Sequence, residues 1–350
     1  MRRYYTRVCN FYYGQESRVL VSKRKTLPLN NNKDISFDHI EIISRKSKKK
    51  ISIKKIKSLP KLLKKQIILD LKNIKLKKKN FANLNFSRIP NIMGVLNLTP
   101  DSFSDGGKFN TKKKGLKHAL EMFKSGANII DVGGESTKPG SNAIHQKLEW
   151  HRIEKILKSI SKKIPISLDT RKSKVMEKGV KYGVKMINDV SGLSFDEKTK
   201  NILKKYKIPF IIQHSQGTPK NMQVKPSYKN ELLDIYDFFD QKIKFLRSIG
   251  IKHNNIIIDP GIGFGKKLKH NMNLISNISI FHSLGFPILV GNSRKRFIKE
   301  ISGKNDTKSR IGGTVASSIY LMMQGIQILR IHDVNELLQG VKVFEKLIRN

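Results

Sequence analysis

Residues 92–109 read IMGVLNLTPDSFSDGGKF, an apolar run that ends in a cluster of short polar side chains. The aliphatic residues at its start are typical of a buried strand. Asn97 and Asp101 are among the polar residues that follow, and Gly106 and Gly107 come next. A buried strand that leads into a loop rich in hydroxyl, amide and carboxyl groups is how α/β enzymes present a functional site.

The same arrangement recurs along the rest of the chain. Short β-branched runs alternate with longer amphipathic stretches, such as 229–249, where apolar residues recur at helical spacing. We expect strands at 92–98, 128–132, 165–169, 186–190, 209–213, 256–259, 287–291 and 327–332. With intervening helices and a last helix at 334–348, the pattern predicts an α/β fold, a (β/α)8 TIM barrel over residues 91–350. A doubly wound open sheet is the alternative, but it usually has fewer strands and leaves open edges.

Residues 1–90 differ from this pattern in composition. They hold 25 Lys and Arg residues against 5 Asp and Glu, with lysine runs such as KSKKK and KLKKK. Two short apolar groups, HIEII and QIILDL, interrupt the charged sequence. We therefore expect a basic N-terminal extension, either a small appended β/α element or a loosely ordered tail, and the sequence leaves both open.

The whole chain carries a formal net charge of +43, from 70 Lys and Arg against 27 Asp and Glu. Such a charge first suggests nucleic acid as a partner. The basic residues are scattered, however, and rarely alternate with aromatic residues. We therefore expect solvated, lysine-rich helix faces and no nucleic-acid partner. A nucleic-acid-binding or scaffolding role of the basic N-terminal segment stays as the non-enzymatic alternative.

Cys9 is the only cysteine, which excludes an internal disulfide and a cysteine-based metal cluster. We expect a cytoplasmic, reducing compartment. No apolar run approaches the roughly 18 residues of a membrane span, so no membrane association is expected. The N-terminus lacks the apolar core of a secretion signal, although its arginines and its lack of acids before Glu16 leave a mitochondrial presequence open.

All eight predicted strands end in polar residues, although the strand bodies are apolar. One such residue alone is typical of a helix cap or a turn. Eight strand ends together would place polar groups in a ring away from bulk water, where a ligand can supply their partners. In strand order the residues are Asn97 and Asp101; Asp131; Asp169, Thr170 and Arg171; Asn188 and Asp189; Gln213 and His214; Asp259; Ser293, Arg294 and Lys295; and Arg330, His332 and Asp333.

Three groups of these residues indicate the kind of ligand. The first has carboxylates and an amide that suit the edge of a flat heterocycle with adjacent N–H and NH2 groups. The second is cationic, or can become so, and suits a phosphate or an anionic leaving group. The third offers hard oxygen donors suited to a Mg²⁺ ion shared with phosphates. The groups are, in that order, Asp169, Asn188 and Asp259; Lys295, Arg330 and His332; and Asn97 and Asp101.

Eight segments of the chain together resemble dihydropteroate synthase, in that family's order: NLTPDSFSDGG, IIDVGGESTKPG, SLDT, INDVSG, HSQGTPKNMQ, IIDPGIGFGK, SRKRFI and RIHDV. The resemblance covers about residues 90–345 and leaves residues 1–90 outside it. It implies a pterin-binding (β/α)8 barrel, a transferase of folate biosynthesis. Such an enzyme condenses 6-hydroxymethyl-7,8-dihydropterin diphosphate with p-aminobenzoate to give 7,8-dihydropteroate and pyrophosphate.

The same resemblance implies Mg²⁺ as the cofactor, a homodimer, and membership of a family that sulfonamides target. A related pterin-binding barrel, which transfers a methyl group from a methylated folate, is the alternative. That class would need neither a pyrophosphate site nor the NLTPDSFSDGG loop. The presence of this loop and of Ser293, Arg294 and Lys295 favours the synthase.

Matched position by position, the resemblance also implies roles for individual residues. The pterin would be bound by Asp169, Asn188, Asp259, Lys295 and Arg330. The pyrophosphate would be bound by Asn97, Thr137, Arg330 and His332, with Mg²⁺ at Asn97. The aminobenzoate would lie between Phe103, Pro139, Phe264 and Lys295. The residues expected to be catalytic are Asn97, Asp101, Lys295, Arg330 and His332.

Three residues depart from the family pattern. Gln213 stands where relatives often carry an apolar Met, at the end of the fifth predicted barrel strand. Lys138 replaces the Arg common in the second loop, which keeps the charge but loses the bidentate geometry. Arg296 follows Lys295 where many relatives have Ser, which adds a cation at the expected mouth of the barrel.

Overall fold

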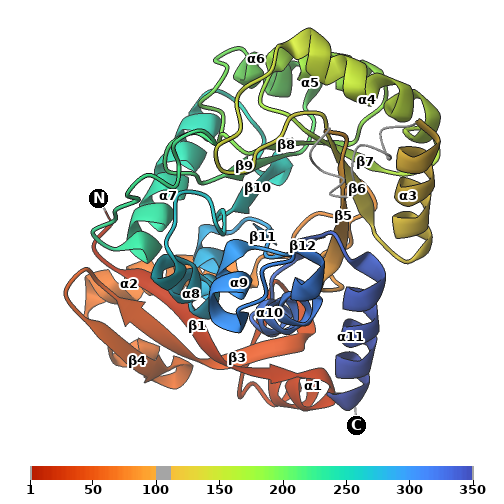
Figure 1. Ribbon diagram of the computed structural model, residues 1–350. Coiled ribbons are helices and arrows are strands. Elements are labelled where there is room, and N and C mark those ends of the chain that lie inside the picture. Colours follow the sequence, from red (N-terminus) through yellow and green to blue (C-terminus); the bar gives the residue numbers. More distant parts are fainter. Residues whose placement is uncertain (1, 100–111, 349–350) are drawn as a thin grey trace.

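The computed structural model describes residues 2–99 and 112–348, which form an N-terminal antiparallel sheet and an eight-stranded parallel barrel (Figure 1). The N-terminal part comprises β1 (Tyr5–Tyr13), α1 (Gly14–Ser22), β2 (Leu27–Leu29), β3 (Asn32–Ile43), β4 (Lys48–Ser52), η1 (Ile53–Ser58) and α2 (Lys61–Lys75). Strand β3 pairs with β1 on one edge and with β2 and β4 on the other.

The N-terminal sheet has a hydrophobic core of its own. Phe37 and Ile40 of β3 are fully buried, and they pack in one cluster with Ile67 and Ile74 of α2. Phe37 and Ile40 are three positions apart and therefore face opposite sides of β3, and apolar residues from both faces belong to this cluster. Of the two forms that the sequence left open for residues 1–90, the structure has the folded β/α element.

Buried polar contacts attach this N-terminal part to the barrel. Tyr5 Oη donates a hydrogen bond to Asp237 of α7 (Glu231–Ser248) at 2.8 Å. The Nζ atom of Lys78 donates to the carbonyl oxygen of Gly285 at 2.7 Å. The sheet therefore lies against one outer side of the barrel, away from β6 (Ile129–Gly133) and β7 (Ile166–Asp169) (Figure 1).

From residue 91 onwards, strands and helices alternate. The elements are β5 (Asn91–Asn97), α3 (Lys112–Lys124), β6, α4 (Gln146–Ile160), β7, α5 (Ser173–Lys181), β8 (Met186–Asp189), α6 (Thr199–Tyr206), β9 (Phe210–Gln213), α7, η3 (His253–Asn255), β10 (Ile256–Asp259), α8 (Leu268–Ser276), η4 (Ile278–Leu284), β11 (Leu289–Val290), α9 (Arg296–Ser302), η5 (Lys308–Arg310), α10 (Ile311–Met323), β12 (Ile328–Ile331) and α11 (Val334–Leu347). All eight predicted strands and the predicted last helix are confirmed.

The eight strands are parallel and close into a barrel. Their order is β10-β9-β8-β7-β6-β5-β12-β11, and a parallel bridge between Ile258 and Ile288 joins the two ends. The (β/α)8 barrel is therefore confirmed, and the open-sheet alternative is wrong. No helix within residues 2–99 and 112–348 combines the length and the hydropathy that a membrane crossing requires.

The barrel interior is apolar toward the amino-terminal ends of its strands. A single buried cluster contains inward side chains from seven strands, and Leu84 and Phe86, from the segment that precedes β5, pack into it. The strand residues in this apolar layer are Met93, Ile129, Met186, Ile211, Ile257, Leu289 and Ile328. Polar side chains further along the strands therefore face the carboxyl-terminal mouth of the barrel, which is where enzymes of this fold bind their substrates.

Candidate active site

A polar layer lies directly above the apolar layer. Side chains alternate between the two faces of a strand, so the residues two positions further along also point into the barrel. We call this set the polar layer, and its members are Asp131, Asp169, Asn188, Gln213, Asp259 and Arg330. The sequence predicted all six at strand ends, and the structure brings them together from β6, β7, β8, β9, β10 and β12.

Asp131 is the centre of a hydrogen-bond network in the polar layer. Its Oδ2 accepts from Arg330 Nε at 2.7 Å and from Asn188 Nδ2 at 2.9 Å. Arg330 Nη2 also donates to Asp169 Oδ2 at 2.9 Å. Asp131 is fully buried. Sequence reasoning identified Asp131 only as a strand end and gave it no role. Its position two residues after the inward-facing Ile129 was the signal that could have indicated one.

Burial perturbs the charges of this network. It raises the pKa of Asp169, and the adjacent Arg330 guanidinium opposes that shift. Burial lowers the pKa of Arg330, but Asp131 and Asp169 outweigh burial and leave that pKa raised. Arg330 is therefore a permanent cation held between two carboxyl groups, and it is suited to stabilise negative charge at the mouth.

Asp259 and Lys295 form a second group of charges in the mouth. Asp259 Oδ1 accepts from the backbone N–H of Gly261 at 2.8 Å. Burial raises the pKa of Asp259 to about 6, against the opposing effect of that hydrogen bond and of Lys295. Burial, helped by Arg330, lowers the pKa of Lys295 to about 8. The Lys295 Nζ lies 4.2 Å from the centre of the Phe264 ring. Two residues expected at the aminobenzoate site, Lys295 and Phe264, are thus in contact.

Positive charge gathers around His332. Its Nδ1 lies 3.0 Å from Ser293 Oγ, and its backbone N–H donates to the same oxygen at 3.2 Å. Burial holds the pKa of His332 well below its usual range, and nearby cations lower it further. These cations are Arg330, Arg294, Lys295 and Lys138. A neutral imidazole among four cations is suited to an anionic ligand such as a diphosphate.

A buried cluster of ion pairs anchors the start of the loop that follows β6. Glu135 accepts from Arg171 Nε at 2.8 Å, from Lys172 Nζ at 2.7 Å and from the backbone N–H of Ile144 at 2.9 Å. Further along the loop, Thr137 is half-buried and Pro139 is exposed. Lys138, in the same loop, is close enough to lower the pKa of His332, which indicates that this loop borders the mouth.

Asn97, at the end of β5, lies beside the polar layer. A Cβ atom added to Gly133 would lie 3.6 Å from Asn97 Oδ1 and 3.3 Å from Asp169 Cβ, so both side chains border the same glycine. Two of the expected site residues, Asp101 and Phe103, lie outside the described residues. Residues 2–99 and 112–348 contain no group of three or more His, Cys, Asp or Glu side chains able to hold a metal ion. Asn97 therefore fits a Mg²⁺ ion only if substrate phosphates supply further ligands, which is how Mg²⁺ is often bound.

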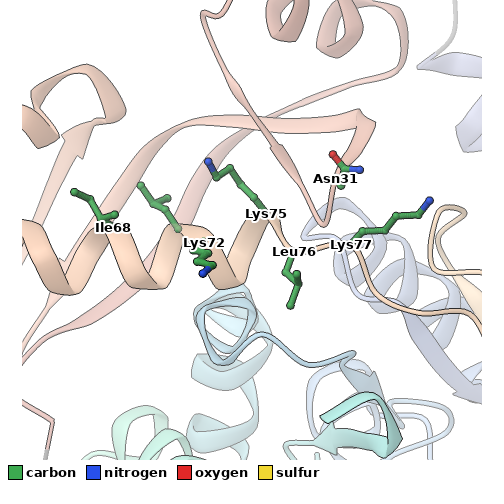
Figure 2. A pocket seen from close by; sticks show the side chains of 7 residues that line it. Asn31, Ile68, Lys72, Lys75, Leu76 and Lys77 are labelled. Carbon is green, nitrogen blue, oxygen red and sulfur yellow. The ribbon is translucent and has the colours of Figure 1, made fainter.

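A surface groove of about 500 Å³ lies elsewhere, along α2 of the N-terminal part (Figure 2). Its lining is aliphatic and basic, and consists of Asn31, Ile68, Leu71, Lys72, Lys75, Leu76 and Lys77. None of these seven residues is a carboxylate or a histidine, so the groove offers no acid–base pair. The chemistry is therefore assigned to the barrel mouth, where the perturbed groups converge.

Comparisons with known proteins agree with this geometry. The family model described as pterin binding enzyme matches residues 93–332. A dihydropteroate synthase from Synechocystis sp. is 38% identical over 260 residues, which cover 74% of this chain and 90% of that protein. The crystal structure of Yersinia pestis dihydropteroate synthase with a sulfonamide drug complex has a TM-score of 0.72 at 38% identity, and the match covers 75% of this chain and 96% of that chain.

A third relative, the dihydropteroate synthase from Xanthomonas albilineans, has a structure in complex with 7,8-dihydropteroate. It is 30% identical with a TM-score of 0.68, and the match covers 75% of this chain and 95% of that chain. The family model spans most of the chain, and the relatives match over nearly their whole length. The chain therefore belongs to the dihydropteroate synthase family of pterin-binding enzymes.

Proposed function

We propose that this barrel condenses 6-hydroxymethyl-7,8-dihydropterin diphosphate with p-aminobenzoate, releasing pyrophosphate and 7,8-dihydropteroate. Family membership supports this reaction, as does the X. albilineans relative in complex with 7,8-dihydropteroate. One observation in particular supports the barrel mouth as the pterin site. Asp131 Oδ1 and Asn188 Oδ1 are buried acceptors that have no hydrogen-bond partner within the described residues. Unpaired buried acceptors favour a ligand that brings N–H groups, and a pterin has these along its pyrimidine edge.

The pterin would lie against the polar layer. Asp169, Asn188 and Asp259 would accept hydrogen bonds from its N–H and NH2 groups. Lys295, whose pKa is about 8, would donate to an acceptor on the ring as a cation at neutral pH. Arg330 would cover one face of the ring while its guanidinium stays bonded to Asp131.

The diphosphate would lie toward the cationic side of the mouth. Asn97, Thr137, Arg330 and His332 are the residues proposed to bind it. A Mg²⁺ ion held by Asn97 and phosphate oxygens would neutralise part of the diphosphate charge when bound. The pKa of His332 lies well below its usual range, so the imidazole is neutral at pH 7 and its Nε2–H can donate to a phosphate oxygen.

The aminobenzoate would occupy the outermost position. Lys295 Nζ and the Phe264 ring, 4.2 Å apart, would bind its carboxylate and pack against its ring. Pro139, exposed in the loop after β6, and Phe103, outside the described residues, would complete this site.

In the reaction, the amine nitrogen of aminobenzoate forms a bond to the methylene carbon of the pterin while the carbon–oxygen bond to the diphosphate breaks. The electron pair of the broken bond leaves with pyrophosphate, and the amine then loses one proton to solvent. Arg330 and His332 stabilise the negative charge that develops on the leaving oxygen. Loss of one such donor should lower the rate by about 10²–10³. An aromatic amine is a sufficient nucleophile once it is positioned, so no strong general base is required.

The test is turnover by the full chain with the pterin diphosphate, aminobenzoate and Mg²⁺, together with pterin binding by Asp259→Ala. Asp259 is 4% exposed and belongs to the polar layer. We expect turnover by the wild type and no measurable pterin binding by the variant. Near-normal pterin affinity of a folded Asp259→Ala protein would contradict this position of the pocket.

We also propose that the chain works in the cytoplasm as a homodimer that forms through its last barrel helices. Tyr320 of α10, and Val343 and Leu347 of α11, are exposed apolar side chains, 45%, 59% and 69% accessible. Burial of such side chains between two copies would favour a dimer. Light scattering should give a dimer mass for the wild type and a monomer mass for Val343→Glu. A monomeric wild type would contradict the proposal.

A further inference from the structure

Gln213, at the end of β9, carries an unpaired hydrogen-bond donor into the barrel mouth. The residue is only 4% exposed, and its Nε2 is buried with no hydrogen-bond partner within the described residues. Gln213 stands in parallel register with Asp259 of β10, so both side chains point into the barrel. An unpaired buried amide costs stability, so such a group is usually satisfied by a ligand or a water molecule.

The surroundings hold this side chain close to Asp259. Gly261 has a φ of +70°, and a Cβ atom there would lie 2.0 Å from the carbonyl oxygen of His214 and 3.3 Å from Gln213 Cγ. Only glycine fits so close an approach without strain, and it brings the loop after β10 over the end of β9. Oδ1 of Asp259 already accepts from the Gly261 N–H, and no hydrogen bond joins Asp259 to the Gln213 amide. The Nε2–H group of Gln213 therefore remains available to a ligand above the polar layer.

The unpaired atoms of the polar layer form a complementary pattern. Among the residues that the structure describes, Asp131 Oδ1 and Asn188 Oδ1 are acceptors without a partner, whereas Gln213 Nε2 is a donor without one. A pterin has N–H donors on its pyrimidine edge and acceptors next to them, at the 4-carbonyl oxygen and at ring N5. The two protein acceptors can therefore pair with pterin N–H groups, and the Gln213 donor can pair with a pterin acceptor.

We propose that Nε2 of Gln213 donates a hydrogen bond to an acceptor of the bound pterin, its 4-carbonyl oxygen or its N5, and thereby selects for 4-oxopterins. The inference deepens the proposed function and rests on it. Gln213 acts as a specificity-determining residue, because a ligand without that acceptor leaves the buried donor unpaired. Rejection of such a ligand then follows from the cost of that unpaired donor rather than from size.

The test compares the wild type with Gln213→Met, since methionine has a similar length and no donor. Calorimetry would measure the affinities of 6-hydroxymethylpterin, of its 5-deaza analogue and of its 4-deoxo analogue. We expect Gln213→Met to bind 6-hydroxymethylpterin about tenfold more weakly than the wild type does. The substitution should cost much less affinity for the one analogue that lacks the accepting atom. That analogue identifies the carbonyl oxygen or N5 as the acceptor, and the comparison cancels effects of Lys295 that both proteins share.

Thermal stability adds a readout that a purely structural role would not produce. Removal of an unpaired buried donor should leave the melting temperature of unliganded Gln213→Met equal to that of the wild type or above it. A residue that merely supports the fold would give the opposite change. Weaker pterin binding by a variant that is at least as stable as the wild type is therefore the expected combination.

Gln327→Met is the matched control. Gln327 is fully buried, and its Nε2 also has no hydrogen-bond partner within residues 2–99 and 112–348, but it precedes β12 at the opposite end of the barrel. Its Oε1 accepts from the Ile288 N–H at 2.8 Å, so Gln327→Met should melt at a lower temperature than the wild type. It should still show the wild-type differences in affinity between 6-hydroxymethylpterin and the two analogues. Equal affinities of wild type and Gln213→Met for 6-hydroxymethylpterin would overturn the inference and leave the proposed function intact. Absence of pterin binding by the wild type would instead refute the proposed function.

Discussion

Arg330 of β12 reaches past β5 to Asp131 of β6, with Nε 2.7 Å from Oδ2, and the two residues are 199 positions apart in the chain. Asp131 is fully buried and also accepts from Asn188. The pair therefore sets the position of the guanidinium that is proposed to cover the pterin and to stabilise the leaving diphosphate. The bonded side chains belong to β6, β8 and β12 of one closed barrel rather than to a loop.

Asp131→Asn tests this relationship. Asparagine keeps the size of the side chain but removes the charge that holds Arg330, so we expect kcat/KM to fall about 10- to 100-fold. The unfolding free energy should fall by about 1–3 kcal/mol, because a buried cation loses one partner. Steady-state kinetics and urea unfolding measure the two effects. Asp34→Asn, at an exposed carboxylate of the N-terminal part, is the control that should change neither. Wild-type kcat/KM in Asp131→Asn would show that Asp131 does not position Arg330.

The pH dependence of kcat/KM should report Lys295. Burial lowers the pKa of Lys295 to about 8, so the amine is protonated below that pH and loses its charge above it. We expect kcat/KM for the pterin substrate to decrease as the pH rises through about 8 in the free enzyme. In Lys295→Arg the decrease should move beyond the accessible range, because a guanidinium stays charged, although the plateau should be lower. An unchanged decrease in the variant would assign it to another group.

Removal of Mg²⁺ should separate diphosphate binding from pterin binding. We expect a chelator to abolish turnover while 6-hydroxymethylpterin, which carries no phosphate, still binds. Asn97→Ala should need a higher Mg²⁺ concentration for half-maximal rate, since one oxygen ligand is lost. Titration of Mg²⁺ in the two proteins makes the measurement. Identical Mg²⁺ curves for the variant and the wild type would exclude Asn97 as a ligand.

Lys78 should make stability depend on pH. The residue is 5% exposed, and burial lowers its pKa from the ordinary lysine value of 10.5 to about 7. Between these values the unfolded chain binds a proton that the folded protein does not, so the unfolding free energy rises with pH across that window. Below about pH 7 the cost of burying the charge is fully present.

Urea unfolding of the wild type and of Lys78→Met would measure this effect. We expect the stability difference between the two proteins to shift in favour of the wild type by about 2 kcal/mol from about pH 7 to about pH 9. Lys78→Met loses the bond from Nζ to Gly285, so its absolute stability is expected to change as well. Lys65→Met, at an exposed lysine of α2, provides the control. A difference that does not vary with pH would place the Lys78 pKa outside this window.

Local sequence patterns predicted the barrel strands because each strand is a short aliphatic run between polar segments. The run at residues 92–98 became β5 (Asn91–Asn97), and the predicted helix at 334–348 became α11 (Val334–Leu347). Period-two alternation also predicts which strand-end residues point inward, since it depends only on neighbouring positions. The polar strand ends were therefore accessible to sequence reasoning one by one, and so was the chemistry of each side chain.

The partners of those side chains were decided only by the tertiary structure. Asp131 and Arg330 are bonded because barrel closure brings β6 and β12 to opposite sides of β5, and no local pattern encodes that distance. The folded state of residues 1–90 likewise depends on the packing of α2 against β3. The lysine-rich sequence of residues 1–90 alone would also have allowed a loose tail. The unpaired donor of Gln213 and the lowered pKa of Lys295 both arise from burial, which is a property of the whole fold. Sequence determines which groups are available, because covalent order sets side-chain periodicity, whereas packing determines which groups lose water and which partners they meet.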